Sequence, residues 1–199
     1  SNFNTWSLAY SLAWAQGNSS YTVIQDETTN LREFPLDWDI RHNISANFTF
    51  RIARGEEFFI PFTNFILPLD DFSANINWAY ASGAPYTPQS YESGQELDTN
   101  SKRMPSTQQT NLRITKGFLL SNKINIKVFA EVENLFKNKN IISVYPKTGN
   151  YYWNGSQIEE SNIPGFVYPE VYYVNSLASK NPLYYNDFRG LTLGFSFNF

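Results

Sequence analysis

Several features are missing from this chain of 199 residues, and each absence excludes a class of protein. The sequence contains no cysteine, which excludes disulfides and thiolate metal sites. It contains one histidine, His42, and no nucleophile–base constellation, so the usual catalytic triads and multi-histidine metal sites are missing too. We therefore expect no enzyme, no metal site and no cofactor.

Long apolar runs and a basic excess are missing as well. No segment approaches the roughly 20 consecutive apolar residues that a membrane-spanning helix needs. The net charge of -3 and a pI near 5.2 argue against a nucleic-acid partner, because nucleic-acid binders carry a basic stripe. The chain begins Ser1-Asn2-Phe3, without an initiating Met or a signal segment, so either a signal was removed or the sequence is an internal piece of a longer protein, and we expect a piece.

What the sequence does contain is strict alternation, most clearly in its last eleven residues. From Arg189 to Phe199, large apolar side chains occupy every second position, and small or polar side chains occupy the others. A period of two predicts a β-strand with one apolar and one polar face. The same pattern recurs in five more segments. The predicted strands cover about residues 4–15, 38–54, 71–83, 110–120, 123–145 and 187–199.

The connections between these strands alternate in length. Residues 16–36, 84–109 and 146–186 form long polar loops, whereas Ser121-Asn122 forms a two-residue turn. Long loops at one end and short turns at the other are typical of bacterial transmembrane barrels, in which alternate residues face lipid and an aqueous lumen. The aromatic content of 18% suits the aromatic girdles of such barrels. We therefore predict an all-β fold, a transmembrane antiparallel β-barrel whose first partner is outer-membrane lipid.

Six strands are too few to close such a barrel, because single-chain examples begin at about 8 strands. An open sheet in lipid would leave two edges of unsatisfied backbone groups, each of which is costly. The remaining strands must therefore come from elsewhere. Two other interpretations stay open. One is a small complete 8-stranded barrel with a structural or adhesion role, which needs residues 58–67 and 167–177 as extra strands, and the other is a soluble β-sandwich that binds carbohydrate.

Charged residues at the polar positions are candidates for a lumen surface. Facing lipid at the membrane midplane, a basic residue would cost about 2 to 4 kcal/mol, so we expect an inward orientation. There these residues would pair with one another, contact a domain inserted into the lumen or contact substrate. Phe129 and Lys116 break the alternation: Phe129 is either a lumen aromatic or part of a bulge, and Lys116 either snorkels to an interface or follows a bulge. The candidates are Arg51, Arg113, Lys127, Glu131 and Glu133.

Charge clusters mark the ends of two strands. Asp37, Asp39, Arg41 and His42 precede a strand, where we expect paired charges rather than a ligand or metal site. Asp70-Asp71 suits a strand cap better than a cation site. The intervening connection, residues 55–70, is unexpectedly apolar, and its prolines speak against a central strand. It is either an extension of the strands or an interfacial segment that rests on the membrane edge.

The last long loop is the densest aromatic region of the chain. Amphipathic rings on exposed loops are good binding surfaces for sugars, peptides or flat organic ligands. They could equally pack against one another and order the loop. The ligand-loop candidates are Tyr151, Tyr152, Trp153, Tyr172 and Tyr173.

Specific motifs resemble one family of outer-membrane proteins. Tyr80-Ala-Ser-Gly-Ala-Pro-Tyr-Thr-Pro88 and Val128-Phe-Ala-Glu-Val-Glu-Asn-Leu-Phe136 are the most specific of them. Asp37-Trp-Asp-Ile-Arg-His42 and Arg103-Met-Pro105, with the Asn111–Lys116 strand, add to the likeness, although Asp37 stands where the family has proline. Over nearly its whole length, the chain resembles the C-terminal barrel portion of a TonB-dependent outer-membrane receptor of the carboxypeptidase-regulatory-like type common in Bacteroidetes.

This resemblance implies the last six strands of a barrel with about 22 strands, wide enough to need an N-terminal plug. It implies a multi-pass protein of the Gram-negative outer membrane that imports a scarce nutrient. Its partners would be the plug and the earlier strands, a TonB-type energy-transducing complex, the barrel assembly machinery and, in some members, a surface lipoprotein. The terminal aromatic residues Phe195, Phe197 and Phe199 resemble the signal that the assembly machinery reads.

Overall fold

The computed structural model describes residues 3–18, 32–59, 66–67, 69–90, 92–121, 124–152 and 182–198. Across these ranges the secondary structure consists of β-strands and one short 3-10 turn, η1 (Pro182–Tyr184), and it includes no α-helix. The predicted all-β class with antiparallel pairing is therefore confirmed.

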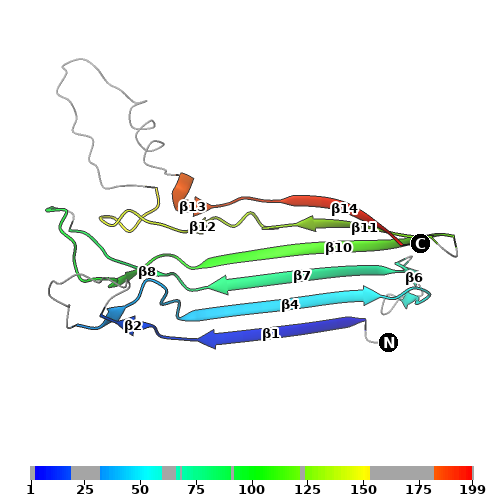
Figure 1. Cartoon of the computed structure of the whole chain (residues 1–199), viewed down its shortest axis with the longest axis horizontal. Coiled ribbons are helices and arrows are strands. Elements are labelled where there is room, and N and C mark those ends of the chain that lie inside the picture. The colour runs from blue at the N-terminus through cyan, green and yellow to red at the C-terminus, as the bar shows by residue number, and fades with distance from the viewer. Residues whose placement is uncertain are drawn as a thin grey trace, which may run out of the picture.

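Six long strands form one sheet (Figure 1). They are β1 (Asn4–Leu12), β4 (His42–Ile52), β7 (Phe72–Ala81), β10 (Thr107–Ser121), β11 (Ile124–Val132) and β14 (Leu191–Asn198). Their order in the sheet is their order in the chain, and each pairs antiparallel with the next. The sheet is open, since among the described residues no strand joins β1 to β14.

Several predicted strand boundaries were wrong, and the reasons are local. The strand expected over 38–54 begins only at His42, because residues 37–38 form a turn and the side chain of Asp39 is buried in the loop. The strand expected over 123–145 ends at Val132, because Asn134 adopts a φ of 51°, which breaks the extended backbone. The strand expected from 187 begins at Leu191, and Phe199 lies outside the described residues.

The register keeps the two faces of the sheet separate from one strand to the next. One row across all six strands consists of Trp6, Phe48, Ile76, Leu112, Val132 and Leu191. The row beside it consists of Thr5, Thr49, Asn75, Arg113, Glu131 and Thr192. Because side chains alternate along every strand, these rows define an apolar face and a polar face.

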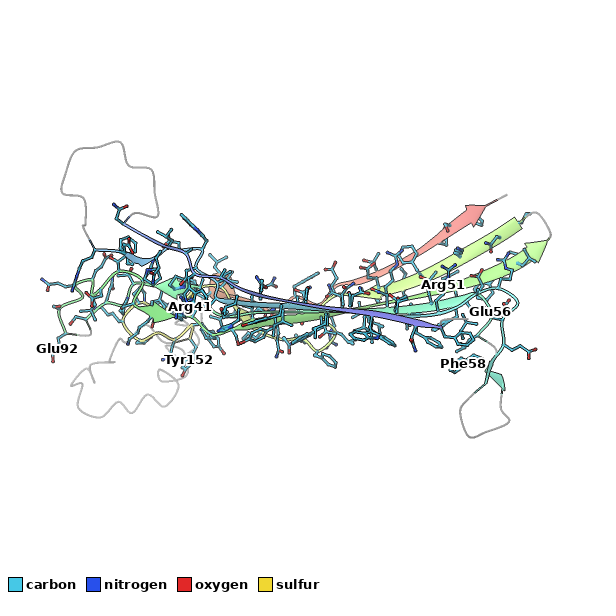
Figure 2. The ribbon with its side chains drawn as sticks, turned by 90° about the horizontal axis from the view of Figure 1, so that it is seen from below. Arg41, Arg51, Glu56, Phe58, Glu92 and Tyr152 are labelled. Carbon is cyan, nitrogen blue, oxygen red and sulfur yellow. The ribbon has the colours of Figure 1, made fainter. Side chains whose placement is uncertain are left out.

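The sheet is a single layer with two different ends. Figure 2 shows it edge-on, with side chains projecting from both surfaces, and the described strands form no second sheet over either of them. Residues 13–41, 82–106 and 133–190 connect strands at the long-loop end, and residues 53–71 and 122–123 connect them at the short-turn end. Both chain termini lie at the short-turn end, on the right of Figure 1.

Four small two-stranded ladders extend these ends. β2 (Gln16–Gly17) pairs with β3 (Phe34–Pro35), β8 (Pro85–Tyr86) with β9 (Lys102–Arg103), and β12 (Asn140–Ile141) with β13 (Tyr185–Asn186), all at the long-loop end. At the short-turn end, β5 (Phe58–Phe59) pairs with β6 (Ile66–Leu67). In the described part of the connection 55–70, β5 and β6 therefore pair with each other and do not extend the strands of the main sheet.

Candidate functional site

The polar face carries the first group of predicted site residues, and two of them form an ion pair. Arg113 on β10 lies directly opposite Glu131 on β11, and Arg113 Nη1 is 3.2 Å from Glu131 Oε2. The guanidinium carbon of Arg113 also lies 4.3 Å from the ring centroid of Phe129. Both side chains of the ion pair are partly exposed, so water screens the attraction and it contributes little stability.

Phe129 lies on the polar face in an unbroken register, so the alternative of a bulge at this position was wrong. It is paired with Gly194 on β14, and its ring occupies the space beside that glycine. A Cβ atom added to Gly194 would lie 2.5 Å from the Phe129 Cε1 and Cζ atoms. A side chain at this position would therefore clash with the Phe129 ring unless the ring moved.

Amide side chains link the polar faces of β4 and β7. Asn47 Nδ2 donates to Asn77 Oδ1 at 2.8 Å, and Asn77 Nδ2 donates to Asn75 Oδ1 at 2.9 Å. Asn75 Nδ2 then donates to Thr49 Oγ1 at 2.7 Å. This ladder satisfies much of the hydrogen-bonding capacity of the polar face internally, without burying any of these groups.

The other charged candidates lie apart from this ladder. Arg51 is at the short-turn end of β4, opposite Ser73, and Lys127 on β11 lies opposite Gly117 and Ser196. Glu133 lies beyond β11 rather than within it, and its N–H donates to the carbonyl of Gly190 at 2.9 Å. The five predicted residues therefore share the polar side of the sheet but do not converge on one point.

The apolar face is exposed to an unusual degree. Trp6 is 76% exposed, Leu193 is 70% exposed and Phe195 is 67% exposed. The terminal-strand candidates Phe195 and Phe197 contact each other on this face, edge to face, with ring centroids 5.2 Å apart. A soluble monomer rarely exposes so large a contiguous apolar surface.

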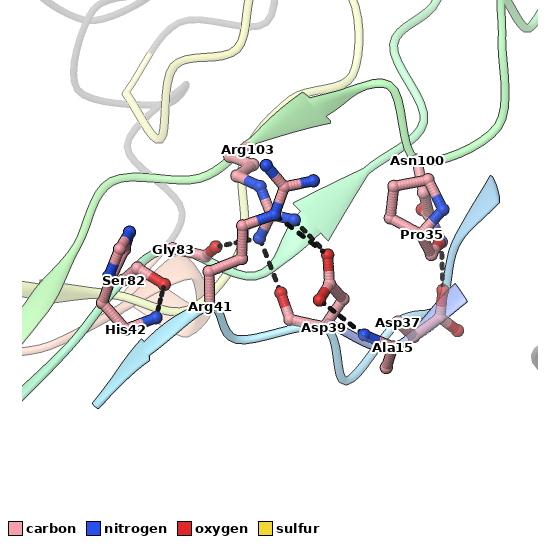
Figure 3. Close-up of polar contacts among 10 residues, drawn as sticks. All are labelled: Ala15, Pro35, Asp37, Asp39, Arg41, His42, Ser82, Gly83, Asn100 and Arg103. Atoms are coloured by element: carbon pink, nitrogen blue, oxygen red, sulfur yellow. Dashed lines mark hydrogen bonds and ion pairs between the residues drawn. The ribbon is translucent and has the colours of Figure 1, made fainter. Parts of the chain in front are cut away.

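Asp39 organises the long-loop end (Figure 3). Its side chain is fully buried and forms an ion pair with Arg103 on β9, and Arg41 Nε lies 3.5 Å from the same carboxylate oxygen. The other oxygen accepts the N–H of Ala15 at 2.9 Å. Arg103 Nη1 also donates to the carbonyls of Asp39 at 2.6 Å and Gly83 at 3.2 Å. These contacts join the ends of β1, β4, β7 and β10, and we call them the Asp39 clasp.

The electrostatics of the Asp39 clasp favour the ionised carboxylate. Burial raises the pKa of Asp39, because a charge is poorly solvated in the interior. The N–H of Ala15 and the guanidinium of Arg103 act in the opposite direction and outweigh the burial, so the pKa lies below its ordinary value. The prediction of paired charges is therefore confirmed for Asp39 and Arg41.

Two buried asparagines with positive φ complete the long-loop end. Asn100 has a φ of 53°, and its Nδ2 donates to the carbonyl of Pro35 at 2.8 Å and to Asp37 Oδ1 at 2.7 Å. Asn134 Nδ2 donates to the carbonyls of Asn138 at 3.0 Å and Phe188 at 3.1 Å. Asn100 thus fixes the loop before β4, and Asn134 joins the end of β11 to the segment before β14.

A tyrosine cluster lies where the last long loop leaves the sheet. Tyr151 contacts Tyr152 edge to face at 5.2 Å and Tyr185 at 5.7 Å between ring centroids. The Lys139 ammonium lies 4.1 Å from the Tyr185 ring centroid and 5.3 Å from that of Tyr151. These loop aromatics therefore pack against one another, as one of the two predicted alternatives required. Trp153, Tyr172 and Tyr173 lie outside the described residues.

His42 is the first residue of β4, where the register pairs it with Leu12 on the apolar face. The ring Nδ1 lies 3.0 Å from the Tyr10 hydroxyl, and the two rings stack at 6.2 Å. Across the described parts of the chain, no group of three or more His, Cys, Asp or Glu residues could hold a metal ion.

At the short-turn end, Asp70 and Asp71 bind neighbouring turns. Asp70 Oδ1 accepts the N–H of Gly55 at 2.6 Å, and Asp71 Oδ2 forms an ion pair with Arg54 at 2.9 Å. Arg54 Nη2 also donates to Asn125 Oδ1 at 2.8 Å. These contacts agree with the predicted strand cap. Lys116 keeps the apolar-face register, and its amine reaches the carbonyl of Asp70, as the snorkelling alternative requires.

Sequence reasoning did not identify Arg103, Asn100, Asn134 or Lys139 as site residues. The motif Arg103-Met-Pro105 was noticed for its family likeness, but nothing local links Arg103 to Asp39, 64 residues earlier. For the two asparagines, the residue type was a weak indication, because asparagine tolerates positive φ better than most residues.

Comparison of the chain with family models, with curated protein sequences and with solved structures finds no match. In the ranges that the structure describes, no helix is long and apolar enough to span a membrane.

Proposed function

We propose that this chain is part of the wall of a transmembrane antiparallel β-barrel in the outer membrane of a Gram-negative bacterium. The single observation that carries the proposal is the apolar face that crosses all six strands of a single-layer sheet and whose side chains are in large part exposed. Strands of 8 to 15 residues suit the role, since a tilted strand needs about 9 to 11 residues to cross the hydrocarbon. The apolar face then contacts lipid, and the polar face lines the interior.

The two open edges support a larger assembly. Within a bilayer, the unpaired backbone groups of β1 and β14 would each cost several kcal/mol, because no water is present to satisfy them. Further strands therefore have to pair with both edges. The family likeness supplies the size of the whole: about 22 strands around a plug, of which these are the last six.

Within that barrel, we propose a receptor that takes up a scarce nutrient with energy supplied through the plug by a TonB-type complex. The long-loop end faces outward, where Tyr151 and Tyr152 belong to a capture surface for ligand. Arg51 and Lys127 on the polar face are candidate contacts for the plug, whereas Arg113 and Glu131 already form an ion pair with each other. This step rests on the motifs ending at Pro88 and Phe136.

The two competing interpretations lack comparable support. A complete 8-stranded barrel needs residues 58–67 as an additional strand, but β5 and β6 pair only with each other among the described residues. A β-sandwich needs a second sheet over the apolar face, and the described strands supply none. Residues 167–177, the other expected strand, lie outside the described part of the chain.

The proposal is tested on the full-length gene product expressed in a Gram-negative host. We expect it in the outer-membrane fraction, released only by detergent, with an electrophoretic mobility that changes on boiling. We also expect a plug domain to be encoded upstream of Ser1. Recovery in the soluble fraction without detergent would exclude the barrel, and a signal peptide immediately before Ser1, with no plug, would favour the small barrel.

A further inference from the structure

The β5–β6 hairpin is the feature of the short-turn end that the barrel wall does not require. The neighbouring connection at this end, between β10 and β11, needs only residues 122–123. The connection 55–70 is longer and contains the paired strands β5 and β6, and its sequence includes Phe58-Phe-Ile-Pro-Phe and Phe65-Ile-Leu-Pro-Leu. A water-exposed turn has no need of so many apolar residues.

Phe58 folds back from this hairpin onto the end of the apolar face. Its ring meets Phe50 of β4 at 5.2 Å and Phe3 at 5.5 Å, both edge to face. Phe72 of β7 lies 6.4 Å from Phe50. We call Phe3, Phe50, Phe58 and Phe72 the phenylalanine cluster. Ile52, at the end of the same face, is 1% exposed, so this corner of the apolar face is covered (Figure 2, at the label Phe58).

Polar contacts hold the base of the hairpin at a defined level. The N–H of Gly55 donates to Asp70 Oδ1, the N–H of Ala53 donates to Glu56 Oε2 at 3.1 Å, and Arg54 bridges Asp71 and Asn125. The base is therefore fixed against the ends of three strands.

Lys116 shows where the apolar surface ends. Its backbone lies in the apolar-face register, yet its amine turns toward the short-turn end and bonds the Asp70 carbonyl. A lysine in this position directs its charge to the polar boundary and leaves its alkyl stem on the apolar surface. The hairpin base thus lies at that boundary, and Phe58 lies on the apolar side of it.

We infer that the β5–β6 hairpin is a membrane-interface anchor, with the phenylalanine cluster inserted among phospholipid acyl chains just below the headgroups. This inference rests on the proposed barrel. The occupant is lipid because the cluster is continuous with the apolar face that the proposal assigns to hydrocarbon. Aromatic rings concentrate at this depth, and interfacial segments bury their apolar side about 5 to 10 Å into the boundary. The anchor resists vertical displacement of the β4–β7 corner.

The test uses single nitroxide labels in the full-length protein, reconstituted into phosphatidylcholine vesicles; residues 1–199 contain no cysteine, and any cysteine elsewhere in the protein is first replaced by serine. Labels are placed at Phe58→Cys and Phe72→Cys in the cluster, at Phe195→Cys on the apolar face and at Glu92→Cys in an exposed turn. Collision with oxygen, which concentrates in lipid, is compared with collision with a water-soluble nickel chelate. We expect an oxygen-to-nickel ratio for Phe58 and Phe72 that is severalfold above that of Glu92 and below that of Phe195.

Each other outcome overturns a defined statement. If both cluster labels match Glu92 while Phe195 remains in lipid, the hairpin is not an anchor and the barrel proposal stands. If neither reagent reaches the cluster labels, the hairpin packs against protein, and the inference is again wrong. If Phe195 itself matches Glu92, the barrel proposal fails, and the inference fails with it.

Discussion

The middle of the sheet and its long-loop end are built on opposite principles. In the described residues, the long-loop end holds most of the buried side chains: Asp39, Asn100, Asn134, Ile141 and Val144. The middle of the strands has large apolar side chains on one surface, many of them more than half exposed, and a hydrogen-bonded ladder on the other. Among the described residues, the long-loop end pairs its buried polar groups within the chain, whereas the strands leave one apolar surface largely uncovered.

This difference shows which part of the protein is stabilised by contacts within the chain. Burying a Leu or Phe side chain stabilises a protein by about 1.5 to 3 kcal/mol, and the apolar face gains little of this within the chain. Its stabilisation must come from outside, and under the proposed function lipid supplies it. The long-loop end is instead stabilised within the chain, by a buried ion pair and two buried amides.

The largest effect is expected from breaking the Asp39 clasp. Asp39→Ala leaves the Arg103 and Arg41 guanidinium groups without their carboxylate, and removal of one partner of a buried pair costs about 3 to 5 kcal/mol. We expect the lower part of that range, because Arg103 is partly exposed. The control is Asp37→Ala, which loses the exposed partner of Asn100 and should cost about 1 kcal/mol. Urea unfolding measures both, and equal losses would contradict the difference between the clasp and its surroundings.

The pH dependence sharpens the same prediction. Because the pKa of Asp39 is lowered on folding, the carboxylate contributes stability at every pH above its ordinary value. That contribution is lost only as the pH falls through the lower pKa of the folded state. The stability difference between the wild type and Asp39→Asn should therefore be constant from pH 7 down to about 5 and shrink below about 4. A difference that vanishes by pH 6 would show that another group controls the clasp.

The second effect tests the middle of the sheet. Phe195→Arg places a charge on the apolar face, and under the proposed function a basic side chain at the membrane midplane costs about 2 to 4 kcal/mol. Ser196→Arg, one position along β14, points to the polar face and should be tolerated far better. The yield of folded protein in the outer membrane measures both variants. Equal tolerance would contradict the assignment of the two faces.

How well the sequence predicts each region depends on how far apart in the sequence its interacting residues lie. The sheet was predictable because alternation is a local property, and an extra residue would have moved every later side chain to the other face. The Asp39 clasp was not predictable, because Arg103 and Gly83 are far from Asp39 in the sequence. The pairing of β4 with β7 brings them close to it in space. Strand ends were misjudged for a related reason: Asn134 breaks β11 through bonds to Asn138 and to Phe188, 54 residues away.

Lys116 and Phe129 lie between the features that local alternation predicts and those that depend on distant contacts. The alternation marked both residues as exceptions, but two explanations remained for each. The choice needed the tertiary structure, which brings the Asp70 carbonyl to Lys116 and Gly194 to Phe129. A local pattern thus located the anomalies, and distant residues explained them.

A smaller effect is expected where the aromatic ring crosses the polar face. Gly194→Ala adds a Cβ in the space of the Phe129 ring, and such overpacking typically costs about 1 to 3 kcal/mol. In a Phe129→Ala background the same substitution should be neutral or stabilising, because the ring is gone and alanine restricts the unfolded chain more than glycine. A double-mutant cycle in thermal unfolding measures this coupling. Additive costs would mean that the ring moves aside without strain.

The smallest effect concerns the Arg113–Glu131 ion pair, whose guanidinium group lies against the Phe129 ring. Both side chains are partly exposed, and exposed pairs contribute only about 0.2 to 1 kcal/mol. Arg113→Gln, Glu131→Gln and the double variant should give a coupling energy in this range that falls as salt is added, because the ions screen the attraction. The size of the coupling then tests the environment of the polar face. A coupling several times larger, insensitive to salt, would mean that in the assembled protein a docked domain excludes water from this surface, so that the polar face, like the apolar one, is completed from outside.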